Sequence, residues 1–285
     1  MLPLKLDVLE KSEYKLVLVV EGISVEMLNV LRRIILTEVP VMAIDEVIIL
    51  KNDSPLYDEI ISHRLGLIPL KTDLDVYKLP KECDCSGFGC PLCQVSLTCE
   101  VTNTTNASLD IFSGDLKSND PKIVPVNDFI PIVKIDKNDK VIIEAYAVLG
   151  LAKDHAKWQA VSNVAFRNYP DITFDVNALK DAEENDLIVK MCPEKLYELA
   201  SNGSLKLKDD YWKHCTLCNS CEKNSDEKIS VRSKEDVYIF TIESDGVLEY
   251  DALIKKVFEI YNEKIDEFVT ELEELEIDPN QPQIY

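Results

Sequence analysis

Short apolar runs alternate with charged turns along this chain, and the spacing of the apolar positions predicts a mixture of strands and helices. Two runs near the start, residues 4–9 and 14–21, predict a β-hairpin with a charged turn. Later runs rich in Val and Ile predict further strands at residues 95–102, 130–135, 141–149, 172–176 and 236–243, and a short strand is also predicted at 205–208. Helical spacing predicts helices at residues 24–38, 58–65, 193–200 and 249–276, the second of them closing at Gly66 as its C-cap.

Two of these helices have more apolar surface than packing on one side requires. Helix 24–38 has apolar residues on more than one of its faces. Arg32 and Arg33 either interrupt this apolar surface or lie at its solvent-exposed edge. Helix 249–276 spaces its apolar residues alternately three and four apart, which is typical of a seam between helices. We therefore expect a partner. The residues assigned to this contact are Leu28, Leu31, Arg32, Ile35, Val257, Ile260, Tyr261, Ile265, Phe268 and Leu272.

The order of the elements predicts a nested α+β organisation. Residues 1–46 and 230–285 are expected to form one discontinuous domain from both ends of the chain. A mainly β segment, 47–175, and a cysteine-rich segment, 176–229, are inserted into it. Residues 277–285 contain two prolines and are expected to form a loose tail.

The charge balance limits the possible partners. Asp and Glu number 52 against 31 Lys and Arg, so the formal net charge is -21. Such a chain repels phosphate backbones, which argues against direct, sequence-independent binding to nucleic acid and leaves only an indirect role with DNA. The sequence has no signal-peptide pattern and no run approaching the roughly 18 apolar residues of a membrane span. We expect a cytoplasmic protein that does not bind a membrane.

Nine cysteines in such a compartment favour metal ligands over disulfides. Four of them, Cys83, Cys85, Cys90 and Cys93, form a compact C-x-C-x4-C-x2-C set with intervening glycines. This pattern predicts a closed, structural zinc site. The alternative is a loop without metal or with partly oxidised thiols. Cys99 follows on a predicted strand and is expected to be a small buried apolar residue.

The later cysteines match half of a bacterial-type ferredoxin. Cys215, Cys218 and Cys221 have C-x2-C-x2-C spacing, and Cys192 is followed by Pro193. This set predicts one iron–sulfur cluster, in preference to zinc or disulfides. A second cluster would need cysteines at four positions that hold other residues: Ala182, Asn185, Ile188 and Ser225. Because a single buried cluster makes a poor electron relay, the pattern suggests a structural or sensing role.

Catalytic patterns are missing from the sequence. It has no G-x-x-x-x-G-K-[ST] or G-x-G-x-x-G loop, and only 8 glycines. The three histidines, His63, His155 and His214, do not form a metalloprotease pattern or accompany a nucleophile. We therefore expect no independent active site.

Three segments resemble the α-like subunits of RNA polymerase, and among them the archaeal D-subunit family, which is related to bacterial α and to the third-largest subunit of eukaryotic polymerase II. The similarity extends over essentially the whole chain, with the motifs in the same order. The segments are NVLRR from Asn29 with PVMAIDE from Pro40, DEIISHRLGLIPL from Asp58, and GLAKDHAKWQ from Gly150.

The resemblance implies a non-catalytic scaffold for transcription. In this family the terminal segments form a dimerisation domain that pairs with the smaller α-like subunit L. With the small subunits N and P, the pair forms the platform for the large catalytic subunits, one of which holds the magnesium ion. The resemblance also implies a zinc-type loop at residues 83–93 and a ferredoxin-like insert whose cluster is 4Fe-4S or 3Fe-4S.

An electron-transfer protein or oxidoreductase subunit is the alternative interpretation. It would use Cys192, Cys215, Cys218 and Cys221, but it gives no role to the two partner-seeking helices or to the segment that begins at Asp58. A third possibility, a zinc-dependent nucleic-acid-binding module, conflicts with the net charge.

Overall fold

A computed structural model describes residues 3–85, 87–174, 179, 182–200, 203–226 and 228–274. The chain divides into two compact units, each assembled from separate stretches of sequence. The first unit contains Met1–Leu9, Val17–Val25 and Ala165–Thr241. The second unit contains Glu10–Leu16, Glu26–Val164 and Ile242–Tyr285. The mixture of helices and sheets that the sequence predicts is confirmed, whereas the proposed three-part domain division stays a prediction.

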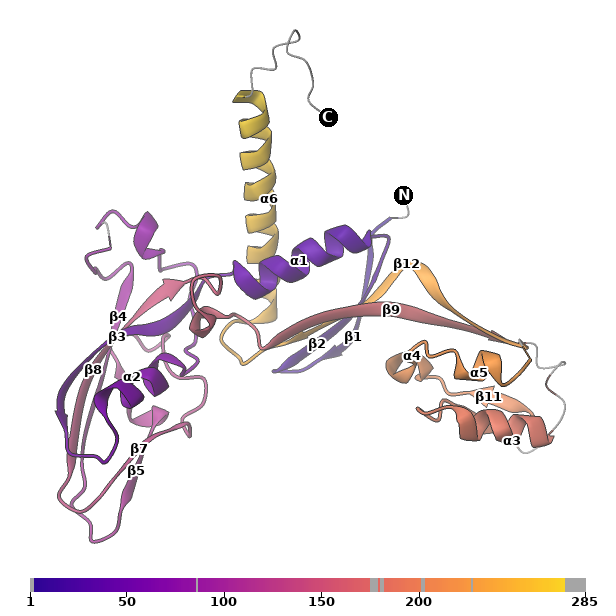
Figure 1. Ribbon diagram of the computed structural model, residues 1–285. Coiled ribbons are helices and arrows are strands. Elements are labelled where there is room, and N and C mark those ends of the chain that lie inside the picture. The colour runs from indigo at the N-terminus through magenta and orange to yellow at the C-terminus, as the bar shows by residue number, and fades with distance from the viewer. Residues whose placement is uncertain are drawn as a thin grey trace, which may run out of the picture. The chain divides into compact units, whose positions relative to one another are not determined.

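Four strands, with most of their residues in the first unit, form a sheet in the order β1-β2-β12-β9 (Figure 1). They are β1 (Lys5–Lys11), β2 (Lys15–Glu21), β9 (Asn163–Phe174) and β12 (Ile229–Glu243). The predicted hairpin is confirmed, and the N–H of Ser12 donates to the carbonyl of Lys15 at 2.8 Å to close its turn. Strands β9 and β12 begin well before the predicted ranges 172–176 and 236–243, and residues 175 and 176 lie outside the described residues.

The cysteine-rich part of the first unit combines three short helices with a small hairpin. Its elements are α3 (Ala182–Met191), β10 (Tyr197–Leu199), β11 (Leu205–Leu207), α4 (Tyr211–His214) and α5 (Ser220–Lys223). The helix predicted at residues 193–200 is wrong, because Tyr197–Leu199 pairs antiparallel with Leu205–Leu207. Lys195 just before it has a φ of +50°, which an α-helix does not allow. Strand β11 confirms the prediction at 205–208, whereas α3 was not predicted.

The second unit is built on an antiparallel sheet in the order β3-β8-β4-β6. These strands are β3 (Val41–Asn52), β4 (Gln94–Thr102), β6 (Lys117–Ser118) and β8 (Lys140–Gly150). Buried and partly buried residues alternate along β8, which pairs with β3 on one side and β4 on the other. A smaller sheet pairs β5 (Leu109–Phe112) with β7 (Pro131–Ile135), and three 3-10 turns, η1 (Pro80–Glu82), η2 (Ser113–Asp115) and η3 (Ala156–Trp158), connect the strands.

Helix α2 (Asp58–Gly66) contacts β3 and β7 and buries Ile61 and Leu65 in the core of the second unit. Its range confirms the predicted helix. The C-cap differs from the prediction, because Gly66 is the last helical residue and the cap is Leu67 at a φ of −93°. Gly66 is not among the residues with positive φ, so the helix ends without the left-handed turn that favours glycine.

Helices α1 (Val25–Thr37) and α6 (Tyr250–Glu274) confirm the two longest helical predictions. The two helices cross in Figure 1, and Lys264 Nζ of α6 lies 2.9 Å from the Glu38 carboxylate just beyond α1. Residues 275 and 276 of the predicted helix, and the predicted tail, fall outside the described residues. None of the helices in the described part of the chain is both long enough and apolar enough to span a membrane.

Candidate metal centres

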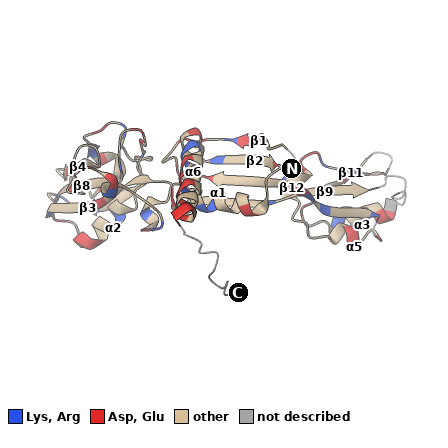
Figure 2. Ribbon diagram, turned by 90° about the horizontal axis from the view of Figure 1, so that it is seen from above, with Lys and Arg blue, Asp and Glu red and all other residues tan. Residues whose placement is uncertain are grey.

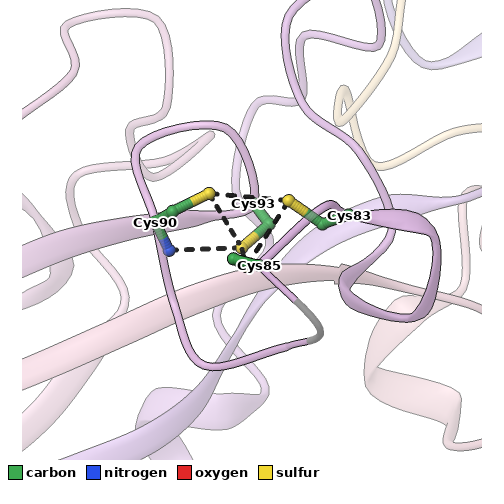
Figure 3. Close-up of side chains that lie close together, drawn as sticks. All are labelled: Cys83, Cys85, Cys90 and Cys93. Atoms are coloured by element: carbon green, nitrogen blue, oxygen red, sulfur yellow. Dashed lines mark hydrogen bonds between the residues drawn. The ribbon is translucent and has the colours of Figure 1, made fainter.

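The first cysteine set lies in the second unit, in the loop between η1 and β4 (Figure 3). Its four Sγ atoms all lie within 4.8 Å of one another. The Sγ of Cys85 is 3.5 Å from those of Cys83 and Cys93, and the Sγ of Cys90 is 3.5 Å from that of Cys83 and 3.7 Å from that of Cys93. Cys83 and Cys93 are buried and the other two are half-buried, so the four thiols face one another rather than solvent.

These spacings fit one tetrahedral metal ion. Four thiolates bound at about 2.3 Å, the zinc–thiolate bond length, stand about 3.8 Å apart along each edge of the tetrahedron. The observed separations of 3.5 to 3.7 Å come close to this edge. The backbone N–H of Cys90 also donates to the Sγ of Cys93 at 3.3 Å, which stabilises negative charge on that sulfur.

Glycines permit the tight path of this loop. Gly87 and Gly89 have φ values of +82° and +88°, in the left-handed region that other residues rarely adopt. A Cβ atom on Gly89 would come within 2.3 Å of Oε1 of Gln94. The glycines between the cysteines are therefore part of the geometry of the site.

The pKa values of these thiols are shifted in different directions. Hydrogen bonding from the Cys93 side chain lowers the pKa of Cys85 to about 6, whereas burial raises the pKa of Cys93 to about 12. Thiolates are the form that binds a metal, and four ionised sulfurs this close would repel one another without a cation. The site thus has the donor type, spacing and charge requirement of a bound cation.

The second cysteine set lies in the first unit and lines one cavity. Cys192 follows α3, Cys215 follows α4, Cys221 lies in α5, and Cys218 lies in the loop between α4 and α5. All four line the same small cavity, together with Pro193, Leu196 and Val231. The Sγ atoms of these four cysteines do not all lie within 4.8 Å of one another, as those of the first set do. A wider arrangement suits a cluster, in which several irons rather than one ion take the thiolates.

The backbone of this loop is shaped for a negatively charged group. Leu217 and Asn219 have φ values of +54° and +57° although neither is glycine. Alternating left-handed residues turn successive N–H groups toward a common centre, an arrangement that many iron–sulfur sites use. The N–H of Ser220 lowers the pKa of Cys218, while burial raises the pKa of Cys215 and of Cys221. Cys218 is the one exposed thiol of the set.

Three of the four positions where a second cluster would need cysteines are part of a packed interior. Asn185, Ile188 and Ser225 are each 0% exposed. The Asn185 amide donates to the carbonyls of Leu179 and Gly203, and the Ser225 hydroxyl donates to the carbonyl of Glu222 and accepts the N–H of Ile229. These side chains therefore have structural roles. His214 is exposed and lies 3.8 Å from the Asp210 carboxylate.

Two residues beside the second set were not predicted from the sequence. The guanidinium of Arg167, on β9, donates to the carbonyls of Trp212, Lys213 and Cys215 at 2.7 to 3.0 Å. Burial lowers its pKa, although it stays charged. Tyr197, on β10, is 1% exposed and shares a core with three of the cysteines. No local motif marks either residue, because the chain must fold back to bring them to the site.

The residues predicted to contact a partner differ in their exposure. Leu28, Ile35, Val257 and Ile260 are buried within the chain itself. Leu31, Arg32 and Tyr261 are half-buried, and Nε of Arg32 donates to Oδ1 of Asn29 at 3.0 Å. The far half of α6 is exposed and remains apolar along one stripe, which we call the α6 stripe: Ile265 41%, Phe268 61%, Val269 45% and Leu272 47% exposed.

The three segments that carry the family resemblance meet at one pocket in the second unit. The pocket is lined by Ile44, Asp45, Val47, Ser62, His63, Gly66, Leu67, His155 and Lys157. Nζ of Lys157 lies 2.5 Å from Oδ1 of Asp45 and 4.3 Å from the centre of the Trp158 ring. Gly150 lets the Trp158 ring pack against the backbone, since a Cβ there would come within 2.3 Å of the ring. These motif residues thus hold one another in place.

Comparison with known proteins identifies relatives along nearly the whole chain. The family described as "RNA polymerase Rpb3/RpoA insert domain" matches residues 43–167. "DNA-directed RNA polymerase subunit Rpo3" of Methanosphaera stadtmanae is 39% identical over 281 residues, which cover 96% of this chain and 100% of the relative. The proteins of the same name from Pyrobaculum aerophilum (39% identical, covering 93% of this chain and 94% of the relative) and Methanopyrus kandleri (34%, covering 87% and 88%) are also similar.

These matches exceed what a shared fold alone would give, and they include the segments that meet at the Asp45–Lys157 pair. The chain therefore belongs to the family of DNA-directed RNA polymerase subunit Rpo3, whose members act only as part of the polymerase complex.

Proposed function

We propose that this chain is a non-catalytic scaffold subunit of the archaeal D type. In this proposal it pairs with the smaller α-like subunit L, and the pair forms, with the small subunits N and P, the platform on which the large catalytic subunits assemble. The observation that carries the proposal is the α6 stripe, because a long apolar face without a cover within the described chain is what a helix-pairing protein needs.

The α6 stripe has the geometry of a helix–helix contact. Its residues follow one another at intervals of three, one and three, which places them on one side of the helix. Fully burying a side chain such as Phe or Leu contributes roughly 1.5–3 kcal/mol, so four partly exposed ones can supply much of an association energy. The buried residues Val257 and Ile260 fix the near half of the helix within the chain and leave the far half for the partner.

The charge of the chain supports a position away from the nucleic acid. Figure 2 shows Lys and Arg interspersed with Asp and Glu along the ribbon. With a net charge of -21, direct contact with DNA would be unfavourable, so the proposed role in transcription is indirect.

The two cysteine sets are proposed to hold different metals. The spacing of Cys83, Cys85, Cys90 and Cys93 supports structural zinc, which would stabilise a loop with little core of its own. The wider spacing of Cys192, Cys215, Cys218 and Cys221 around one small cavity, with the left-handed residues of their loop, supports an iron–sulfur cluster of the 4Fe-4S or 3Fe-4S type. We assign this cluster a structural or sensing role. The proposed location is the cytoplasm, because cysteines that serve as metal ligands suit a compartment that keeps thiols reduced.

A substitution on the α6 stripe tests the pairing. Phe268→Asp places a carboxylate where a partner helix would exclude water, and an unpaired buried charge opposes association. Coexpressed with subunit L, the unaltered chain and the control Glu267→Gln should co-elute with it, whereas Phe268→Asp should not. Glu267 is also exposed on α6. Co-elution of Phe268→Asp at the same ratio as the control would refute the proposed interface.

A further inference from the structure

Tyr197 occupies a fixed position in the core beside the second cysteine set. It begins β10, opposite Leu207 on β11, and is 1% exposed. Its ring meets the ring of Phe174 nearly edge-on, with centroids 6.4 Å apart and planes at 71°. Cys192, Cys215 and Cys221 belong to the same core. The strand pairing and the ring contact thus determine where the hydroxyl lies.

The hydroxyl of this tyrosine is buried and has no hydrogen-bond partner among the described residues. Native proteins rarely leave such a group unsatisfied, because a buried polar atom without a partner costs about 1–3 kcal/mol. A tyrosine hydroxyl keeps its proton at neutral pH and is therefore a donor. It needs an acceptor in the space around it.

Sulfur atoms are the acceptors available on that side. Burial raises the pKa of Tyr197, and its neighbours Cys221, Cys192 and Cys215 raise it further, which is consistent with their shared core. The hydroxyl makes no hydrogen bond to any of these thiols. These three thiols also line the cavity assigned to the cluster. Sulfur bound to iron carries negative charge and is a better acceptor than a neutral thiol.

We propose that Tyr197 donates a hydrogen bond from its hydroxyl to the Cys221 sulfur of the bound cluster and thereby raises the reduction potential of the cluster. This inference rests on the proposed assignment of the four cysteines to an iron–sulfur cluster. A hydrogen bond to a cluster sulfur stabilises the more negative, reduced state more than the oxidised state. The proton stays on the tyrosine oxygen throughout, and the single electron comes from the reductant.

The test compares tyrosine-to-phenylalanine changes at two buried positions. Tyr197→Phe removes only the hydroxyl. Tyr250→Phe is the matched control, because Tyr250 also has a buried hydroxyl without a partner among the described residues but belongs to the other unit. Each full-length chain is purified anaerobically with its polymerase partners. Iron and sulfide are quantified, and the cluster is titrated with dithionite and redox mediators under electron paramagnetic resonance.

The expected result is equal iron and sulfide in all three proteins, a lower potential in Tyr197→Phe, and an unchanged potential in Tyr250→Phe. Equal potentials in all three would overturn the role of Tyr197 while leaving the cluster assignment intact. An unaltered chain without iron and sulfide would overturn both.

A second substitution keeps the test decisive if Tyr197→Phe fails to retain iron. Incorporating 3-fluorotyrosine at position 197 preserves the hydroxyl and makes it a stronger donor, so the potential should rise above that of the unaltered chain. A potential that stays the same would contradict the proposed hydrogen bond.

Discussion

Gly89 adopts a φ of +88° in the four-cysteine loop, with the amide of Gln94 where a side chain would begin. At this position the restriction comes from the backbone more than from the neighbour, because Gln94 is flexible and can move aside. A left-handed conformation costs a residue with a Cβ roughly 1–2 kcal/mol. That cost acts directly on the folded, metal-binding form of the loop.

We predict that Gly89→Ala weakens metal retention by Cys83, Cys85, Cys90 and Cys93 by about tenfold, since roughly 1.4 kcal/mol corresponds to a factor of ten. Competition with a chromophoric chelator measures the effect. Phe88→Ala is the control in the same loop, because Phe88 is 92% exposed and should be dispensable for the metal. Equal retention by the two variants would contradict the geometric role of Gly89.

At the scale of the elements, Arg167 connects strand β9 to the end of helix α4. A helix leaves its last carbonyls without partners, and Arg167 satisfies the carbonyls of Trp212, Lys213 and Cys215 at the entry to the second cysteine loop. Because the guanidinium is partly buried and charged, these bonds are worth more than an exposed ion pair. The strand thus helps to fix the position of Cys215.

We predict that Arg167→Gln destabilises the cysteine-rich part of the first unit by about 2 kcal/mol or more, since a hydrogen bond to a charged group contributes roughly 1.5–3 kcal/mol. Urea unfolding followed by the absorbance of the cluster measures this loss. Lys190→Gln is the control in the same part of the chain, because both side chains of its ion pair with Asp186 are exposed, 69% and 46%, and the pair should contribute little. Similar unfolding midpoints for both variants would show that Arg167 has no special role.

The elements differ in how well the sequence predicts them. Helix α6 follows from its spacing alone, because its apolar residues repeat over many turns. Strand β3 has no alternating pattern by which the sequence would predict it, because its first four residues are all buried and the rest are more exposed. The segment that contains strand β10 has Pro193 at its start followed by good helix formers, so its composition favours a helix, whereas pairing with Leu205–Leu207 makes it a strand. Local spacing does not record such pairing.

The same distinction applies to the candidate sites. The cysteines of the first set lie close together in sequence, and those of the second set combine a close triplet with a Cys-Pro pair, so both patterns can be recognised. Arg167 reaches Cys215 across 48 residues, and Tyr197 has no pattern of its own. The sequence also does not predict which apolar residues of helix α6 are exposed. Val257 and Phe268 belong to the same apolar stripe in the sequence, yet Val257 is 1% exposed and Phe268 is 61% exposed.

At the scale of the whole molecule, the two cysteine sets belong to different compact units. Cys83 to Cys93 lie in the second unit, and Cys192 to Cys221 lie in the first. Because each set has its own supporting elements, the metals should be bound independently.

We predict that replacing Cys90 and Cys93 by Ser removes zinc but leaves the visible absorbance of the iron–sulfur cluster unchanged. Cys218→Ser should have the opposite effect and weaken assembly with the partner. Iron, sulfide and zinc measured on each anaerobically purified variant test this expectation. Loss of both metals from either variant would mean that the cysteines have been divided between the sites incorrectly.

The most direct test of the scaffold proposal is an anaerobic affinity purification of the tagged chain from its own cells, with the accompanying proteins identified and quantified. The scaffold account predicts the large catalytic polymerase subunits and the small subunits L, N and P in stoichiometric amounts. Recovery with flavoproteins or other redox proteins, and without polymerase subunits, would contradict it and favour a role in electron transfer.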